Sequence, residues 1–579
     1  MSSATASPAR RTAPLAVHAP FLVALLAGLA LRVVVMVAYR PALLFPDSFG
    51  YLRRAHDLVM DDMRPLGYSL FLKPIVTVTD SLAAVSLVQH LLGLVIALLC
   101  YAFLLRRGLP RWAATLAALP VLLDPLQLVL EHYMLSDVLF EILLLGACLA
   151  LLWRHRPGYV AVGLAGLLAA SSGIVRGAGT FVLVVFVVAL LCLRLPWHKV
   201  LVFLVGAAVV FVPYVMAFHA AYGKYAVSVA GPRFLYSRIA PKVHCPGLEL
   251  PSYEKKLCPE QPVGQRPDTN YYMWGRHRAA QWHLNPPPGM SALQVVKDFD
   301  KRVLRAEPLT YSKAVLTDLA GGFAPTRTYQ VPGYPASYWL FADHYWSMDQ
   351  WVPDRSTDHR AVLRNAGLDQ GAADFLVGYR HWLWTPGPLM ALLLLLAAGA
   401  ATGFGRARRS GDRVAIGLLA GCCLLTLATG AAVSGFSWRY QLPQLPMLST
   451  AGALAIAALV RGRLPGMPPE EQRLRPLDRV ADLLVHRTPE LRRAAERGVL
   501  QARLAQLAGV VAAVVSAVLV VGSGWVALGP AVLGGICGGV VVTLLLLGAR
   551  RRAMTDAPPP ERGAESSAQE PSDVMLTRR

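Results

Sequence analysis

Charged side chains are scarce in this sequence of 579 residues. Asp, Glu, Lys and Arg make up 16% of it, whereas soluble domains carry about a quarter. Hydrophobic residues reach 55% and the mean hydropathy is +0.45. This balance excludes an ordinary soluble domain and predicts a membrane protein.

Acidic residues are scarcer than basic ones, with 35 Asp and Glu against 56 Lys and Arg, for a net charge of +21. On a soluble protein such an excess suggests nucleic-acid binding. Here the basic residues fall mostly between apolar segments, so we expect membrane lipids with anionic headgroups as partners and no nucleic acid.

Several motifs that would carry chemistry are missing from the chain. It has no Walker loop, dinucleotide-binding glycine motif, nucleophile elbow or HExxH sequence, and none of its eight cysteines follows a zinc spacing. Most of the cysteines lie in apolar runs, but Cys245 and Cys258 lie in a long polar loop. A disulfide between these two would require an oxidising compartment, and the sequence leaves open whether they pair.

Apolar segments long enough to cross a bilayer recur along the chain. Each crossing needs about 20 residues. The sequence therefore predicts an all-α polytopic membrane protein with about 12 transmembrane helices, near 16–38, 81–105, 112–130, 135–153, 158–175, 178–194, 199–220, 385–403, 413–434, 440–460, 507–527 and 529–549.

The distribution of Lys and Arg over the short loops predicts the orientation. Both termini are expected in the cytoplasm and two loops outside, because basic residues concentrate in cytoplasmic loops. We expect a bacterial inner (plasma) membrane protein whose parts are a cytoplasmic N-terminus 1–15, a transmembrane core 16–220 with the outer loop 39–80, an extracytoplasmic loop or small domain 221–384, more core 385–460, a basic cytoplasmic connector 461–506, a transmembrane hairpin 507–549 and a disordered tail 550–579.

The first outer loop holds two candidate site residues, Asp47 and Arg64. A carboxylate just outside the first span can act as a general base toward a hydroxyl or bind a divalent cation, although Asp47 also suits a helix N-cap. Arg64 precedes Pro65 and offers a planar cationic fork that fits phosphate oxygens. Its alternative is an unspecific contact with lipid phosphate.

Two acids mark the fourth expected span. Asp137 opens it, and Glu141 follows four residues later on the same helical face. Ionisable groups in a membrane are costly, so a functional role is the default interpretation. The alternative for Asp137 is favourable interaction with a helix N-terminus.

Three further arginines are candidates. Arg176 lies between the fifth and sixth spans, where it can approach a carrier phosphate or pair with Asp137. Arg439, followed by Tyr440 and two prolines, lies at the outer entry to the tenth span. Arg32, inside the first span, either pairs with a buried acid or snorkels to the interface.

The order of these motifs resembles the GT-C superfamily of polyprenyl-phosphate-dependent glycosyltransferases, most closely its aminoarabinose transferase and protein O-mannosyltransferase branch. The resemblance covers about residues 1–460. It rests on Arg32, on Asp47 with Tyr51 four residues later, on the turn from Arg64 to Tyr68, on Asp137, on Arg176 beside glycine, and on Arg-Tyr-x-x-Pro-x-x-Pro from Arg439.

This resemblance implies a GT-C-like helical membrane domain and a role for each matching residue. Asp47 matches the family's first-loop acid, a base or metal ligand, and Asp137 the second acid near the acceptor or metal. Arg64 matches the basic residue that meets the donor phosphate, and Arg176 and Arg439 match outer-face cations. We take Tyr51, Tyr68, Glu141 and Tyr440 as supporting residues.

The sequence departs from the family in the first loop, where a second acid often follows the first but Ser48 follows Asp47 here. A metal site formed by Asp47 and Asp137 therefore stays open, and a divalent ion is the one cofactor considered. The expected activity is inverting transfer of a sugar from a polyprenyl-phosphate donor to a cell-envelope acceptor on the outer face. A lipid-linked glycan transporter or flippase, a polysaccharide polymerase or ligase, and an inactive scaffold are the alternatives.

Overall fold

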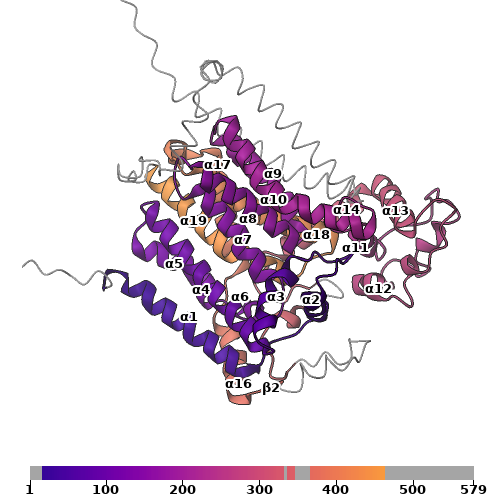
Figure 1. Cartoon of the computed structure of the whole chain (residues 1–579), viewed down its shortest axis with the longest axis horizontal. Coiled ribbons are helices and arrows are strands. Elements are labelled where there is room, and N and C mark those ends of the chain that lie inside the picture. Colours follow the sequence, from indigo (N-terminus) through magenta and orange to yellow (C-terminus); the bar gives the residue numbers. More distant parts are fainter. Residues whose placement is uncertain (1–15, 331–334, 346–365, 463–579) are drawn as a thin grey trace, which may run out of the picture.

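The computed structural model describes residues 16–330, 335–345 and 366–462. The expected N-terminus 1–15, the connector from residue 463, the hairpin 507–549 and the tail 550–579 lie outside the described residues. The described part is mostly helical (Figure 1). The expectation of a helical membrane protein is confirmed at this level.

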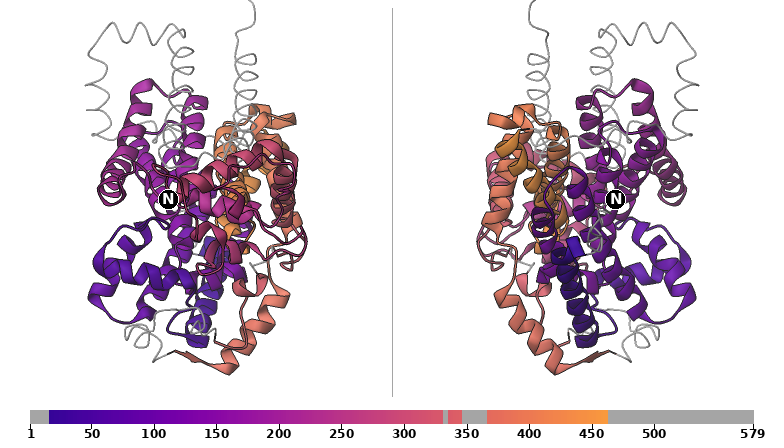
Figure 2. Two further views of the ribbon diagram at one scale, coloured as in Figure 1. Left: turned by 90° about the vertical axis from the view of Figure 1, so that its right-hand side faces the viewer. Right: turned by 90° about the vertical axis from the view of Figure 1, so that its left-hand side faces the viewer.

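The helices of residues 19–222 lie beside helices of the last described part (Figure 2). The first group consists of α1 (Ala19–Ala38), α2 (Pro46–Asp57), α3 (Gly67–Val78), α4 (Leu82–Arg106), α5 (Arg111–Leu123), α6 (Pro125–His132), α7 (Asp137–Leu152), α8 (Tyr159–Val175), α9 (Ala178–Cys192) and α10 (Trp197–Tyr222). The second consists of α16 (Gln370–Trp382), α17 (Gly387–Thr402), α18 (Arg413–Val433) and α19 (Gln444–Arg461). Helix α18 is the central one, since 83% of its span is buried against 17% for α10.

Fewer helices than expected are long and apolar enough to cross a membrane. Within the described residues, five single helices meet that length and composition, or up to seven if the bent pairs α5–α6 and α16–α17 each count as one span. Helices α8 and α9 are apolar but shorter. The total of twelve stays a prediction, partly because two of the expected segments lie beyond residue 462.

The expected span 112–130 corresponds to a bent pair of helices, because the chain turns by 47° between α5 and α6. Proline at position 125 cannot donate a backbone hydrogen bond, and Asp124 accepts a hydrogen bond from the backbone N–H of Leu126 (2.8 Å). A new helix therefore starts at Pro125.

The loop 39–80, here called the first loop, contains α2 and α3. The expected N-cap role of Asp47 is wrong, because α2 begins at Pro46 and Asp47 lies in its first turn. The hydroxyl of Ser48 instead accepts a hydrogen bond from the backbone N–H of Phe45 (3.0 Å) and donates one to the carbonyl of Met134 (2.9 Å). The Asp47 carboxylate is left available for other partners.

In the segment 221–384, here called the long loop, residues 231–321 form a small helical unit. It contains α11 (Gly231–Ile239), α12 (Thr269–Trp274), α13 (Ala292–Ala306) and α14 (Pro308–Gly321), and a disulfide joins Cys245 to Cys258. The apolar core of this unit includes residues 431–433 at the end of α18, and Tyr311 donates a hydrogen bond to the carbonyl of Ala432 (2.8 Å). Strands β1 (Tyr39–Arg40) and β2 (Gly367–Leu368) pair antiparallel and tie the long loop to the first loop.

Candidate functional site

Five of the residues singled out from the sequence lie together and form one ion cluster. They are Asp47 of α2, Arg64 just before α3, Asp137 at the start of α7, Arg176 between α8 and α9, and Arg439 in the short helix Trp438–Gln441. Each comes from a different element, so the cluster exists only in the folded chain. Three guanidinium groups and two carboxylates give it a formal charge of +1.

Arg439 occupies the middle of the ion cluster and bridges its two acids. Its Nη2 donates to Oδ2 of Asp137 (2.8 Å) and its Nε to Oδ1 of the same carboxylate (3.3 Å). Its Nη1 donates to Oδ2 of Asp47 (3.3 Å). A single planar guanidinium therefore fixes the spacing of the two carboxylates.

The remaining arginines complete the cluster from two sides. Arg64 donates to Oδ1 of Asp47 through Nε (3.0 Å) and Nη2 (2.6 Å), and Arg176 donates to Oδ1 of Asp137. The side chains of Arg64, Asp47 and Arg176 are 21%, 17% and 18% exposed, whereas that of Asp137 is fully buried. The cluster is thus open to ligand at Arg64, Asp47 and Arg176 and closed at Asp137.

Aromatic rings line the arginines of the ion cluster. The guanidinium carbon of Arg64 lies 5.0 Å from the ring centre of Trp274, and that of Arg439 lies 5.3 Å from Trp339. Arg176 lies 5.3 Å from the ring of Tyr440. These contacts hold the guanidinium planes while leaving their N–H edges free to donate, and the supporting role of Tyr440 stays a prediction.

Two other expected supporting residues lie behind the cluster. Tyr51 and Tyr68 pack edge to face with ring centres 4.9 Å apart, and Tyr68 donates to Oε1 of Gln89 (2.7 Å). Burial and the neighbouring Asp47 raise the pKa of Tyr51, so its phenol stays protonated. Among the described residues, neither tyrosine hydroxyl forms a hydrogen bond with a carboxylate of the ion cluster, so their position favours packing.

Glu141 lies outside the ion cluster, although it follows Asp137 by one helical turn. Its Oε2 accepts a hydrogen bond from Nε2 of Gln127 (2.9 Å), and its Oε1 has no hydrogen-bond partner among the described residues. Glu141 therefore faces α6 rather than Arg176 and Arg439. The sequence predicts that Glu141 and Asp137 share a face of the helix, but it does not predict which neighbouring element Glu141 contacts.

A buried group of four ionisable residues was not predicted as a unit. Arg32 donates to Oε1 of Glu131 (2.7 Å), His90 Nδ1 lies 2.8 Å from Oε2 of Glu131, and His90 Nε2 lies 3.2 Å from Nδ1 of His132. Of the two interpretations of Arg32, the structure supports a buried acid partner and contradicts snorkelling. An arginine in an apolar span was the signal for a buried acid elsewhere, but nothing in the sequence selected Glu131.

The carboxylates of the ion cluster do not form a shared metal site. Asp47 and Asp137 face opposite edges of Arg439, and their oxygens accept hydrogen bonds from guanidinium groups. Within residues 16–330, 335–345 and 366–462, no group of three or more His, Cys, Asp or Glu side chains is arranged to hold a metal ion. The arrangement instead suits an anion that competes with the carboxylates for the arginines.

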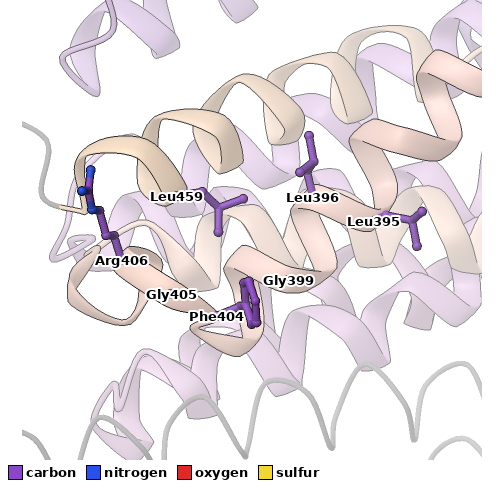
Figure 3. A pocket seen from close by; sticks show the side chains of 7 residues that line it. All are labelled: Leu395, Leu396, Gly399, Phe404, Gly405, Arg406 and Leu459. Atoms are coloured by element: carbon purple, nitrogen blue, oxygen red, sulfur yellow. The ribbon is translucent and has the colours of Figure 1, made fainter.

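A separate groove of about 560 Å³ lies between the end of α17, the short helix Gly405–Arg409 and α19 (Figure 3). Its walls are apolar apart from Arg406, whose Nη1 donates to the carbonyl of Val460 (2.7 Å). It shares no residue with the ion cluster, and we assign it no part in the chemistry.

The ion pairs of Asp47 predict how the stability of the fold depends on pH. Burial acts to raise the pKa of Asp47, but Arg64 and Arg439 outweigh it and hold the pKa below its usual value. A depressed pKa in the folded state stabilises the fold above the unfolded pKa of about 3.9. That stability is lost as the pH falls through the folded pKa.

We therefore expect the thermal unfolding temperature of the detergent-solubilised protein to fall between about pH 5 and pH 3, and to fall less for Asp47→Asn. The matched control is Asp57→Asn, at the exposed C-terminal end of the same helix. Identical pH dependence of Asp47→Asn and the wild type would contradict the ion pairing of Asp47.

Asp318 in α14 holds the segment that carries Arg439. Its Oδ2 accepts hydrogen bonds from Arg238 (2.5 Å) and from the backbone N–H of Phe436 (3.1 Å), and its Oδ1 accepts one from Tyr329 (2.8 Å). Asp318 and Arg238 are 3% and 2% exposed. Nothing in the sequence singled out this contact, because Asp318 is one acid among many in the long loop.

Asp318→Asn is expected to destabilise the protein by about 3 kcal/mol, because it leaves the buried guanidinium of Arg238 without a counter-charge. Thermal unfolding in detergent measures this loss. Asp298→Asn is the control, since its pair with Lys301 is partly exposed and is worth under about 1 kcal/mol. Equal unfolding temperatures of the two variants would rule out the anchoring role of Asp318.

The fold and the cluster define a helical membrane protein with an arginine- and aspartate-rich site formed by its first loop, the start of α7, the connection between α8 and α9, and the short helix before α19. Comparisons with protein-family models, curated proteins and solved structures find no match for this chain.

Proposed function

We propose that this protein transfers a sugar from a polyprenyl-phosphate donor to a cell-envelope acceptor on the extracytoplasmic face of a bacterial inner membrane. The observation that carries the proposal is the ion cluster, in which Arg64, Arg176 and Arg439 hold Asp47 and Asp137. This combination provides cations for a phosphate beside a carboxylate that can accept a proton.

The donor phosphate competes with the carboxylates for the arginines. A bidentate guanidinium–phosphate contact replaces bonds such as those from Arg64 to Asp47. When the bond between the sugar and the phosphate breaks, the phosphate gains a further negative charge. The arginines therefore stabilise the departing phosphate more than the bound donor, which lowers the barrier.

Asp47 is the general base of the proposed reaction. While paired with Arg64 and Arg439 it is a weak base, because its pKa is depressed. Phosphate binding withdraws guanidinium donors and raises its basicity toward the range that general-base catalysis needs. Donor binding and activation of the base are thus coupled.

The proposed reaction is a single displacement at the anomeric carbon of the donor sugar. The acceptor hydroxyl gives its proton to Asp47, and its oxygen forms a bond to the anomeric carbon. The bond from that carbon to the phosphate oxygen breaks, and the electron pair leaves with the polyprenyl phosphate. Direct attack inverts the anomeric centre. Asp137 has no place for an acceptor while it is enclosed by Arg176 and Arg439, so its role is to position them.

The test uses membranes that contain the wild-type protein and a panel of radiolabelled polyprenyl-phosphate sugars. Release of free polyprenyl phosphate above that of membranes lacking the protein is expected for at least one sugar. Arg64→Gln should reduce this release, whereas Arg53→Gln, on the exposed face of α2, should not. No release from any donor in the presence of envelope acceptors would count against the transferase.

A transporter of lipid-linked glycans is the second candidate. The observation in its favour is the pair of bent helices, α5–α6 at 47° and α16–α17 at 51°, since broken helices are common in transporters. Both bends coincide with prolines, Pro125 and Pro386, which explain them locally. Movement of intact donor across proteoliposomes, without release of polyprenyl phosphate, would select this alternative.

A further inference from the structure

A cationic and aromatic patch lies in the long loop, next to the ion cluster. It consists of Arg233 in α11, Trp274 at the end of α12, Arg276 and Trp282, and we call it the loop patch. The guanidinium carbons of Arg233 and Arg276 lie 3.8 Å and 5.3 Å from the ring centre of Trp282. Two arginines are thus held against one indole.

The charges of the loop patch are not balanced within it. Neither Arg233 nor Arg276 has an ion-pair partner in the part of the chain that the structure describes. Asp62 attracts Arg233 without forming a direct ion pair, and Arg276 repels it. Arg233 is also half-buried, so water screens it poorly. An anion between the two guanidiniums would relieve this repulsion.

Trp274 connects the loop patch to the ion cluster. Arg64 lies over its ring at 5.0 Å, and Phe234 braces it edge to face at 6.0 Å. Trp274 nevertheless remains 37% exposed. An exposed indole with a fixed orientation offers a flat apolar surface on which the C–H face of a sugar ring can pack.

Hydrogen bonds hold the loop patch at a fixed position relative to Arg64. The backbone N–H of Val229 donates to the carbonyl of Asp62 (2.9 Å), and the hydroxyl of Ser228 donates to that of Met63 (2.9 Å). The indole N–H of Trp282 donates to the carbonyl of Met273 (3.2 Å). The patch and the first loop therefore behave as one surface next to Asp47 and Arg64.

We propose that the loop patch is the acceptor subsite and that it selects a saccharide carrying an anionic group. The sugar ring packs on Trp274, and its phosphate or carboxylate lies between Arg233 and Arg276. A hydroxyl of that saccharide then reaches the carboxylate of Asp47 beyond Arg64. The assignment of this ligand to an acceptor rests on the proposed glycosyl transfer.

The test measures binding by isothermal titration calorimetry to the purified full-length protein in a neutral detergent. The probes are trigalacturonate, which is anionic, and maltotriose, which is neutral. Trigalacturonate is expected to bind about tenfold or more tightly than maltotriose, because charge-assisted hydrogen bonds are stronger than neutral ones. The preference should weaken as salt is added.

Variants separate the two parts of the subsite. Arg233→Gln with Arg276→Gln should remove the preference for the anionic probe, and Trp274→Ala should weaken both probes. Arg278→Gln, which is exposed and stacks on no ring among the described residues, is the matched control and should change neither. Each variant is compared with the wild type for thermal unfolding, so that a folding defect is recognised.

Three results would overturn the proposal. The first is no detectable binding of trigalacturonate, and the second is equal binding to the wild type and the double arginine variant. The third is arginine-dependent binding of short-chain phosphatidylglycerol in place of the saccharide, which would make the patch a lipid-headgroup site. The binding measurement contains no donor, so its result does not depend on glycosyl transfer. If anionic saccharides bind but the membrane assay shows no donor turnover, the proposed transferase is refuted and the patch remains a site for anionic saccharides.

Discussion

Asp47→Asn is expected to lower the rate of polyprenyl-phosphate release by about 10²–10⁴-fold, the usual contribution of a positioned general base. Asparagine keeps the size of the side chain but cannot accept the proton of the acceptor hydroxyl. The variant should bind donor at least as well as the wild type, because Arg64 and Arg439 lose a competing carboxylate.

Measuring the rate at saturating donor and the donor concentration for half-maximal rate separates these effects. Asp57→Asn, at the other end of α2, is the control and should retain the wild-type rate. Full release by Asp47→Asn would remove Asp47 from the mechanism. A rate loss accompanied by equally weakened donor binding would show that Asp47 organises the arginines rather than accepts a proton.

Arg439→Gln is expected to have the second large effect, on both stability and transfer. Arg439 provides two of the hydrogen bonds to the fully buried Asp137 carboxylate and bridges it to Asp47. Its loss should destabilise the protein by about 3 kcal/mol, as for other broken buried ion pairs. Release of polyprenyl phosphate should fall by about 10²–10³-fold, because one cation of the proposed phosphate site is gone.

The double variant Arg439→Gln with Asp137→Asn distinguishes the two roles. Removing the buried charge of Asp137 should restore much of the unfolding temperature, whereas transfer should stay low. Arg461→Gln, at the exposed end of α19, is the control for both measurements. If the double variant regained transfer together with stability, Arg439 would be a structural residue only.

Arg439→Lys adds a sharper comparison. Lysine keeps the positive charge but cannot bridge two carboxylates with one planar group. A bridging role therefore predicts that Arg439→Lys behaves like Arg439→Gln in the stability measurement. Wild-type stability of the lysine variant would mean that charge alone matters at this position.

The sequence singled out candidate residues but did not predict how they are arranged. Asp47, Arg64, Asp137, Arg176 and Arg439 were selected as a possible base, as phosphate-binding cations or as an acid at the head of a span, and for the order of their motifs. The structure brings all five together. Their roles in catalysis stay predictions, since no comparison bears on the activity.

For two other residues, the structure selects a contact that the sequence did not predict. Asp47 was open to interpretation as a helix cap, yet the N-cap residue of α2 is Phe45, whose backbone N–H donates to the hydroxyl of Ser48. Glu141 shares a helical face with Asp137 but pairs with Gln127. For both Asp47 and Glu141, the neighbouring sequence allowed more than one contact. Which contact forms depends on the element that packs beside the side chain.

The sequence by itself determined the class of this protein, because long apolar runs must form helices that satisfy their own backbone hydrogen bonds. It also determined where charges interrupt those runs. Only the tertiary structure decided that Arg439 would bridge Asp47 and Asp137, which precede it by 392 and 302 residues. The physical reason is that helix formation depends on neighbours along the chain, whereas an ion pair of this separation depends on how the helices pack.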